Sequence, residues 1–243
     1  MKKFTLIELL IVIGIISILT SILLPSLQNA LRSTKSSVCL NNEKQINIAM
    51  VSYADDNSLY FPSGSESTET WDDLIGDGYD GRNNDSSQSL NEAYKLYSCP
   101  LDRVARSTNK LKRSYSINSL NARGLEENTG NHLGIASFSY ISRRYSDIPF
   151  PSNTIAIFDY HRRNNWLGQN GGSRVRLAEV QEERDNASFW RHGFGKLNFL
   201  MVDGSAKNLD LTATLLGKAS AWDGSNVAPA NTMWDAGTKR TSP

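Results

Sequence analysis

The feature that most constrains this chain is a long apolar segment close to its N-terminus. Residues 9–31 contain no charged side chain, and most of them are Leu or Ile. About 20 apolar residues in a helix are enough to span the hydrocarbon core of a bilayer. Arg32 is the first charged residue after this segment, and no other apolar run in the chain approaches its length. We therefore predict one membrane-spanning helix near the N-terminus.

A cleaved secretory signal is the competing interpretation, with Lys2 and Lys3 as its basic start. The apolar core of such a signal usually has about 7–15 residues and is followed by small residues at the cleavage site. Residues 9–31 exceed that length, lack such a site and are followed by further helical patterning, which favours a retained helix. The charges leave the orientation open, because Arg32 and Lys35 follow the segment that Lys2 and Lys3 precede.

After the apolar segment the helical pattern becomes amphipathic. Apolar residues recur at spacings of three and four, interleaved with charged and amide side chains. These positions are Leu27, Leu31, Val38, Ile46, Ala49, Met50 and Tyr53. The pattern predicts one helix over residues 4–55. Residues 4–31 are expected to span the membrane or to mediate assembly. The amphipathic continuation over residues 32–56 is expected to pack on a soluble domain.

Two residues interrupt the apolar helix. Glu8 lies one turn inside it, where an ionised carboxylate is unfavourable and usually has a partner. Glu8 is therefore either an interfacial side chain that reaches the lipid headgroups or the partner of a cation from a neighbouring subunit. Pro25 removes one helical hydrogen bond, so it marks either a kink inside the helix or the point where the helix leaves the membrane.

Residues 2–10 (KKFTLIELL) resemble the N-terminal motif of type IV pilins and of type II secretion pseudopilins. The resemblance implies that a prepilin peptidase removes residues 1–3 by cutting between Lys3 and Phe4, and that Phe4 is then N-methylated. It also implies that the new ammonium group neutralises Glu8 of a neighbouring subunit, and that Pro25 lies where the helix can stretch in a filament. The family usually has Gly before the Phe, whereas this chain has Lys3.

The rest of the chain predicts a domain of class α+β over residues 57–216. Residues 63–91, rich in Ser, Asp, Asn and Gly, predict a long ordered loop. Short strands are expected at residues 114–117, 137–141, 154–158, 197–202 and 206–211. Asp203-Gly204 predicts a hairpin between the last two. A helix followed by successive strands indicates an antiparallel sheet. Residues 217–243 predict a loop-rich C-terminal tail.

Several short segments of this domain resemble a large group of pseudopilin-like proteins that carry a His–x–Asp-Gly element near the C-terminus. The segments are residues 39–45, 98–102, 114–118 and 151–154. The element corresponds to His192 followed by Asp203 and Gly204, with one residue more between the His and the Asp than is usual. The resemblance implies a pilin-like fold, with a long N-terminal helix packed on a small antiparallel sheet domain with long loops.

Cys39 and Cys99 are the only cysteines in the chain. In a domain outside the cytoplasm, two cysteines alone predict one disulfide, and two separate thiols are the alternative. A cysteine-based zinc site is not expected, because two further ligands at metal spacing are missing.

His192 is the residue most suggestive of chemistry. Together with Asp159, His161 and Asp203 it forms a candidate metal-binding or acid–base cluster. However, no nucleophile elbow, phosphate-binding loop or zinc-binding helix motif accompanies these residues. We therefore expect a structural role, with His192 bonded to a backbone group or to Asp203, and with Gly204 allowing the turn. No catalytic residue, resident metal or other cofactor is predicted.

A group of acidic residues and a group of arginines each have two alternative interpretations, one as a ligand-binding site and one as an ordinary solvated surface. Five acids between residues 72 and 85 suggest calcium, but they lack the alternation of an EF-hand, which favours a solvated loop. They are Asp72, Asp73, Asp77, Asp80 and Asp85. Arginines at positions 143, 144, 162, 163, 174 and 176 suggest a DNA-binding surface, but nearby acids and a net charge of +1 favour a solvated face. Nucleic acid is not expected as a partner.

Two functions are consistent with these features. The first is a non-enzymatic pilin or pseudopilin that polymerises through its N-terminal helix, with copies of itself or other pilin-like subunits, into a type II secretion pseudopilus or pilus-like filament. Its further partners would be the prepilin peptidase and the assembly machinery of the bacterial inner membrane, which the chain would cross once, leaving its C-terminal domain in the periplasm. The second is an extracytoplasmic enzyme or ligand-binding module on a membrane tether. Glu8 favours the first, because a tether needs no acid in its apolar segment.

Overall fold

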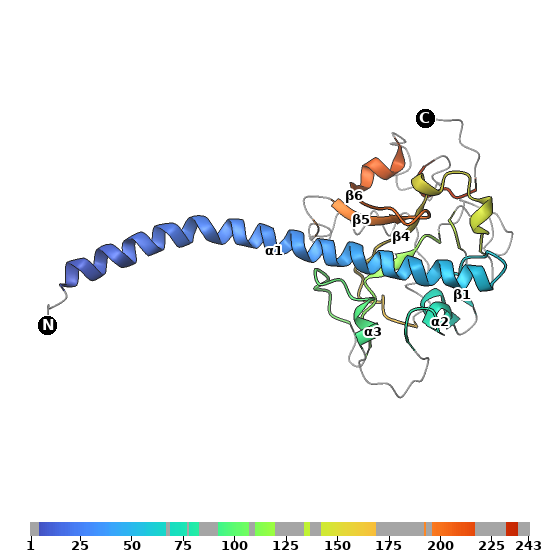
Figure 1. Ribbon diagram of the computed structural model, residues 1–243, viewed down its shortest axis with the longest axis horizontal. Helices are drawn as coiled ribbons and strands as arrows, with labels where there is room; N and C mark the ends of the chain where they lie inside the picture. The colour runs from blue at the N-terminus through green and yellow to red at the C-terminus, as the bar shows by residue number, and fades with distance from the viewer. Residues whose placement is uncertain are drawn as a thin grey trace.

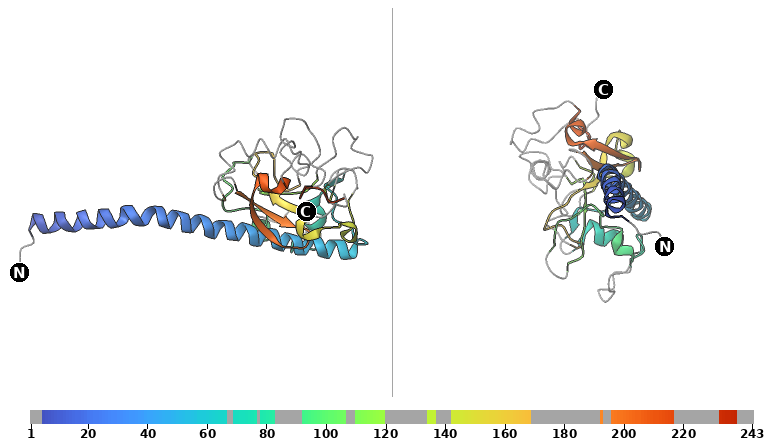
Figure 2. Two further views of the ribbon diagram at one scale, coloured as in Figure 1. Left: turned by 90° about the horizontal axis from the view of Figure 1, so that it is seen from above. Right: turned by 90° about the vertical axis from the view of Figure 1, so that its left-hand side faces the viewer.

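The computed structural model describes residues 5–66, 69–76, 78–82, 92–106, 110–119, 134–136, 142–168, 192, 196–216 and 232–237. One helix dominates it. Helix α1 comprises Leu6–Asp56 and continues through Pro25 without a break. Its second half lies along a small globular part, and its first half projects well beyond that part (Figures 1 and 2). The observed helix begins and ends close to the predicted residues, 4 and 55.

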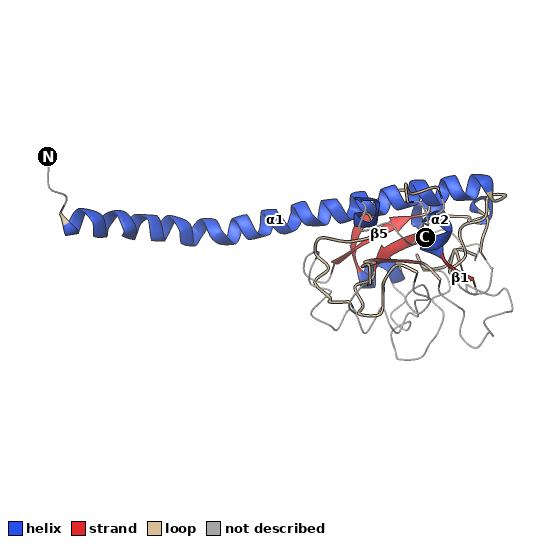
Figure 3. Cartoon of the chain, turned by 90° about the horizontal axis from the view of Figure 1, so that it is seen from below, coloured by secondary structure: helices blue, strands red, loops and turns tan. Residues whose placement is uncertain are grey.

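A small antiparallel sheet packs beside the second half of α1 (Figure 3). The strand order is β3 (Tyr115–Ile117), β4 (Ile155–Asp159), β5 (Lys196–Met201) and β6 (Ala206–Asp210). Each neighbouring pair is antiparallel. Strands β5 and β6 form the hairpin that the Asp203-Gly204 pair predicted, and the layout confirms the α+β class. The strand expected at residues 137–141 lies outside the described residues.

Strands β3, β4 and β5 are buried on both faces of the sheet, whereas β6 is partly exposed. Because side chains alternate along a strand, β5 directs Leu200 into the cluster that contains Ile46 and Met50 of α1. The same strand directs Phe199 into a second cluster on the other face. Trp234, from the predicted tail, fills this second cluster, with its ring centroid 5.9 Å from that of Phe199.

The segment predicted as a long loop contains regular structure, so that prediction was wrong in part. Strands β1 (Ser65–Glu66) and β2 (Glu69–Thr70) form a short antiparallel pair, and helix α2 (Trp71–Gly76) follows. Helix α3 (Glu92–Lys95) begins just after this segment. Helix α2 is stabilised by burial of Trp71 and Ile75 and by the Thr70 amide, which donates to Asp73 Oδ2 at 2.9 Å. Six residues are too few to show helical periodicity in the sequence.

Three 3-10 turns complete the described backbone. They are η1 (Tyr145–Asp147), η2 (Pro151–Asn153) and η5 (Leu211–Leu215). Proline begins η2, where its fixed φ suits the first helical position and its missing N–H has no intrahelical acceptor to lose. Turn η2 leads into β4, and η5 follows β6, so both turns frame the sheet.

Candidate functional site

The first half of α1 presents apolar side chains on all sides. From Leu6 to Leu31 its large apolar residues are exposed, and the first buried residue of the helix is Cys39. A contiguous apolar surface of this size marks contact with a membrane or with another protein. By length and composition this part of α1 is able to cross a bilayer.

Glu8 closes the N-terminal end of α1. Its Oε2 accepts hydrogen bonds from the backbone amide and the hydroxyl of Thr5, both at 2.8 Å, while the Glu8 amide donates to Thr5 Oγ1 at 3.3 Å. This reciprocal arrangement is a capping box, which satisfies amide groups that have no partner within the helix. The Thr-x-x-Glu spacing that signals it is present in the sequence, but the sequence analysis did not use it.

Of the other residues predicted to act in assembly and processing, the structure describes only Pro25. Lys3 and Phe4, between which cleavage is expected, lie outside the described residues. Pro25 lies inside α1, and the helix continues on both sides of it. Whether Pro25 marks the point where the helix leaves the membrane stays a prediction.

The two cysteines form a disulfide. Cys39 of α1 and Cys99, in the loop before β3, are joined with their Cα atoms 5.0 Å apart. Both residues are buried in the cluster between α1 and the sheet. The bond therefore ties the second half of α1 to the loop that leads into the sheet.

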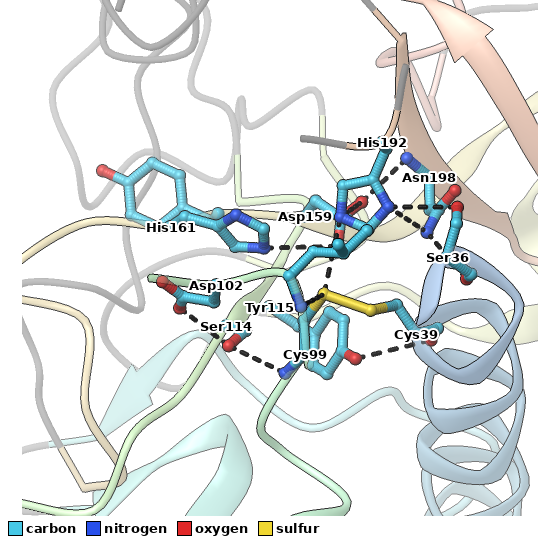
Figure 4. Close-up of polar contacts among 12 residues, drawn as sticks. Ser36, Cys39, Cys99, Asp102, Ser114, Tyr115, Asp159, His161, His192 and Asn198 are labelled. Carbon is cyan, nitrogen blue, oxygen red and sulfur yellow. Dashed lines mark hydrogen bonds and ion pairs between the residues drawn. A yellow bond between two sulfur atoms is a disulfide. The ribbon is translucent and has the colours of Figure 1, made fainter. Parts of the chain in front are cut away.

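Next to the disulfide lies a group of side chains that we name the histidine–aspartate cluster: Asp159, His161 and His192 (Figure 4). Asp159 ends β4, His161 follows two residues later, and His192 precedes β5; all three are buried. The Asp159 carboxylate lies between the two rings, with Oδ2 3.3 Å from His192 Nε2 and Oδ1 3.6 Å from His161 Nε2. The candidate group predicted from the sequence also contained Asp203; the structure brings Asp159, His161 and His192 together and leaves Asp203 in an exposed turn.

Contacts around His192 connect the cluster to α1, to β5 and to the disulfide. His192 Nδ1 lies 3.1 Å from both Ser36 Oγ of α1 and Asn198 Nδ2 of β5. Its Nε2 lies 3.5 Å from Cys99 Sγ. The Asn198 backbone amide donates to Asp159 Oδ2 at 2.8 Å and so holds that carboxylate in place. Neither Ser36 nor Asn198 was predicted from the sequence, because their roles depend on the docking of α1 against β5.

A buried carboxylate lies on the other side of His161. Asp102 accepts hydrogen bonds from Arg106 Nη2 at 2.7 Å and from Ser114 Oγ at 2.8 Å. Burial by itself would raise the pKa of Asp102, but nearby His161, Arg106 and these hydrogen bonds together lower it. Asp102 is therefore a carboxylate at neutral pH.

Glu43 of α1 is buried with neither carboxyl oxygen hydrogen bonded among the described residues. Burial, and secondarily the charge of nearby Asp159, raises the pKa of Glu43 well above its usual value. In the sequence, Glu43 is one of the polar residues between the apolar positions of the amphipathic helix, and this pattern does not indicate that its carboxyl group is buried.

The Asp203-Gly204 pair has the turn role expected of it. Gly204 has a φ of +81°, and Asp203 Oδ1 accepts the Ser205 amide at 2.9 Å. Asp203 is exposed in the hairpin turn, whereas His192 is buried and has Asp159, Ser36 and Asn198 as neighbours. Of the two partners expected for His192, Asp203 thus lies in the exposed turn, while the side chains of Asp159, Ser36 and Asn198 lie next to the buried ring.

The acidic residues considered for calcium are partly engaged by arginine. Asp72 pairs with Arg113, and both are buried. Asp80 Oδ2 accepts from Arg82 Nε at 2.6 Å. Asp77 and Asp85 lie outside the described residues. Within the described part, Asp72 and Asp80 therefore serve ion pairs that join α2 to its surroundings.

Three of the described arginines of the basic doublets lie beside aromatic rings or a carbonyl group, and Arg163 is exposed. The Arg144 guanidinium lies 4.8 Å from the Tyr60 ring centroid, and that of Arg162 lies 5.7 Å from the Tyr160 centroid. Arg143 Nε donates to the Gly134 carbonyl at 3.2 Å. These contacts belong to intramolecular packing.

No protein family model, no curated protein and no solved structure matches this chain. The function of this chain is therefore inferred from the chain's own residues and their geometry. Those residues present two candidate sites: the apolar half of α1 with Glu8 at its start, and the buried histidine–aspartate cluster beside the disulfide.

Proposed function

We propose that this protein is a structural subunit of a filament of the type IV pilin or type II secretion pseudopilin kind. One observation carries the proposal: the apolar half of α1 projects from the globular part and has a single carboxylate, that of Glu8, in its first turn (Figure 1). The resemblance of residues 2–10 to the pilin motif supports the same function. The subunit performs no reaction; its role is to polymerise.

The exposed apolar surface needs a cover both before and after assembly. In the proposed function, lipid of the bacterial inner membrane covers it first, with the globular domain on the periplasmic side. In the filament, the same helices of other subunits replace the lipid. Transfer between these environments costs little hydrophobic energy, since lipid tails and Leu or Ile side chains are equally apolar.

Glu8 provides the register in this proposal. Both hydrogen bonds that the structure gives its carboxylate are to Thr5 of the same chain and use Oε2. A charged carboxylate surrounded by apolar helices is strongly unfavourable without a cation. After cleavage by a prepilin peptidase, the ammonium group of Phe4 in a neighbouring subunit supplies that cation, and only one axial offset of the two helices allows the pairing.

The test is a cross-linking comparison in cells that contain the assembly machinery. A photoreactive residue at Val12 or Leu19 reports which helices touch, and the Cys39–Cys99 disulfide stays intact. We expect Glu8→Leu to enter the membrane as wild type does, because the helix becomes more apolar, yet to lose the ladder of cross-linked subunits. The control Glu69→Gln removes an exposed acid from the globular part and should keep the ladder.

The opposite result favours a different function. Identical cross-link ladders for wild type and Glu8→Leu would leave Glu8 as a helix-capping residue with no part in assembly. The projecting helix would then be a tether for an extracytoplasmic enzyme or ligand-binding module.

A further inference from the structure

The histidine–aspartate cluster has no part in the filament function proposed above. Asp159, His161 and His192 lie beside the part of α1 that carries Ser36 and Cys39, after the exposed apolar half of the helix (Figure 4). Their potential ligand atoms, with Cys99 Sγ, all lie within 4.8 Å of one another, and each of these residues is buried. Burying two imidazoles and a carboxylate together is unfavourable unless their polar atoms are satisfied.

Two of those atoms are not satisfied within the described residues. Neither Nε2 of His161 nor Oδ1 of Asp159 has a hydrogen-bond partner there, although the two atoms face each other at 3.6 Å. Most buried side-chain polar atoms in proteins do have a partner. Two neighbouring atoms that each have a lone pair and no hydrogen-bond partner therefore point to a binding position for a cation between them.

The distances fit a tetrahedral metal ion. Bonds of about 2.0–2.1 Å from zinc to nitrogen or carboxylate oxygen require ligand atoms about 3.3–3.4 Å apart. His192 Nε2 lies 3.3 Å from Asp159 Oδ2, and His161 Nε2 lies 3.6 Å from Asp159 Oδ1. These two distances use different oxygens of Asp159, and all the potential ligand atoms lie within 4.8 Å of one another, so rotation of the carboxylate and movement of the rings would complete the site.

Outer contacts that orient metal ligands are present as well. The Asn198 amide holds Asp159 Oδ2, and Ser36 Oγ lies 3.1 Å from His192 Nδ1. A histidine that binds metal through Nε2 carries its proton on Nδ1 and donates it to a neighbour. The Ser36 hydroxyl can accept that proton, whereas Asn198, which directs Nδ2 at the ring, would have to rotate its side-chain amide to avoid two facing donors.

We propose that Asp159, His161 and His192 bind one Zn²⁺ ion between the sheet and α1. Two imidazoles and one carboxylate suit zinc, whereas calcium and magnesium take six or more oxygen ligands. Cys99 supplies no thiolate while it is bonded to Cys39, so the fourth position is left to water or another small ligand. Through Ser36, the ion fastens α1 to the domain a second time, next to the disulfide.

The test uses the full-length chain in detergent micelles, stripped with a chelator and with its disulfide intact. Titration with Co²⁺ alone should give the visible absorption of a tetrahedral ion, saturating at one equivalent, and Zn²⁺ should displace it. Absence of that absorption together with no Zn²⁺ binding by calorimetry would overturn the proposal. Filament assembly is measured separately, so failure of either proposal is distinguishable from failure of the other.

Variants locate the ion. His161→Gln removes a ligand whose Nε2 makes no described hydrogen bond, and the circular dichroism of the metal-free variant should match that of metal-free wild type. It should weaken Zn²⁺ binding more than the roughly 10–100-fold expected for Ser36→Ala, which removes only the acceptor for His192. Asp203→Asn, in the exposed hairpin turn, is the matched control and should bind as wild type does. Unchanged binding by His161→Gln would refute the site.

A last variant uses the neighbouring sulfur. Cys39→Ser breaks the disulfide and leaves Cys99 as a thiol 3.5 Å from His192 Nε2. Cys99 should then complete the coordination as a thiolate, adding a sulfur-to-cobalt charge-transfer band and tightening binding. A Co²⁺ spectrum identical to that of wild type would contradict the placement of the ion.

Discussion

Glu43 places a carboxyl group without a described hydrogen-bond partner between α1 and the sheet. Burial, and secondarily the charge of Asp159, raises the pKa of Glu43. The neighbouring Tyr115 hydroxyl is neutral, because burial first, and then Asp159 and Glu43, raises its pKa. A neutral Glu43 is therefore the form compatible with the fold. Among single residues, it is the one whose ionisation most directly opposes docking of α1.

This property predicts a pH dependence. The unfolded chain has the ordinary pKa of about 4.5 at Glu43, and the folded chain has a higher one. Between the two values the folded state binds more protons, so the free energy of unfolding falls as pH rises. Glu43→Gln should abolish this loss and be more stable than wild type at neutral pH.

Denaturant unfolding from pH 4 to 8, with a chelator present, measures the effect. The difference between Glu43→Gln and wild type should be small near pH 4 and should grow as pH rises. The exposed-site control Glu69→Gln should follow wild type throughout. Parallel curves for wild type and Glu43→Gln would show that Glu43 is not buried as a neutral acid.

At the scale of elements, the Cys39–Cys99 disulfide is the covalent link between α1 and the sheet domain. It closes a loop with a sequence separation of 60. In the chain-entropy account, such a bond stabilises by about 4 kcal/mol, because it restricts the unfolded chain. Replacing both cysteines by Ala should lower the free energy of unfolding by up to this amount. The measurement is denaturant unfolding of the two proteins in the same detergent.

The same bond predicts a chemical result. Unfolded but unreduced wild-type protein should contain no thiol that reacts with an alkylating reagent, and reduction should expose two. Alkylation of both cysteines before reduction would show instead that Cys39 and Cys99 are separate thiols, the alternative that the sequence left open.

The β5–β6 hairpin depends on Gly204. Its φ of +81° is unfavourable for residues with a Cβ, and a Cβ at this position would lie 3.0 Å from Asn47 Nδ2 of α1. Gly204→Ala should therefore destabilise by about 1–2 kcal/mol from backbone strain alone. Thermal unfolding measures it, and Ala in place of half-buried Ser205 is the neighbouring control. An equal effect of both changes would contradict a special requirement at Gly204.

At the scale of the whole molecule, one helix serves two environments. The half of α1 from Cys39 onward contributes buried residues to the globular core, while the half before Leu31 is exposed and apolar. The globular part therefore folds around one end of α1 and leaves the other for partners. This division is what the proposed filament requires.

The proposed assembly also predicts a processed N-terminus. Intact-mass measurement of protein taken from the membrane of its own host should give a chain that begins at Phe4 and carries one methyl group. A chain that begins at Met1 or Lys2 would speak against processing by a prepilin peptidase and would leave no ammonium on Phe4 to pair with Glu8.

Periodicity and turn chemistry made much of the fold predictable. The ends of α1, the class α+β and the β5–β6 hairpin follow from local patterns, because helix spacing and an Asp-Gly turn are encoded in neighbouring residues. Helix α2 and the β1–β2 pair were missed because each is only a few residues long. Trp234 was given no role, since its contacts with Phe158 and Phe199 join distant parts of the chain.

The sequence by itself determined that an apolar helix with one acid leads into an α+β domain, because these properties depend on residue type and short spacing. Only the tertiary structure decided what surrounds His192. Asp159 and His161 come from the end of β4 and Ser36 from α1, whereas Asp203 remains in an exposed turn. Those distances depend on how strands pair and where the helix docks, which no local pattern of residues encodes.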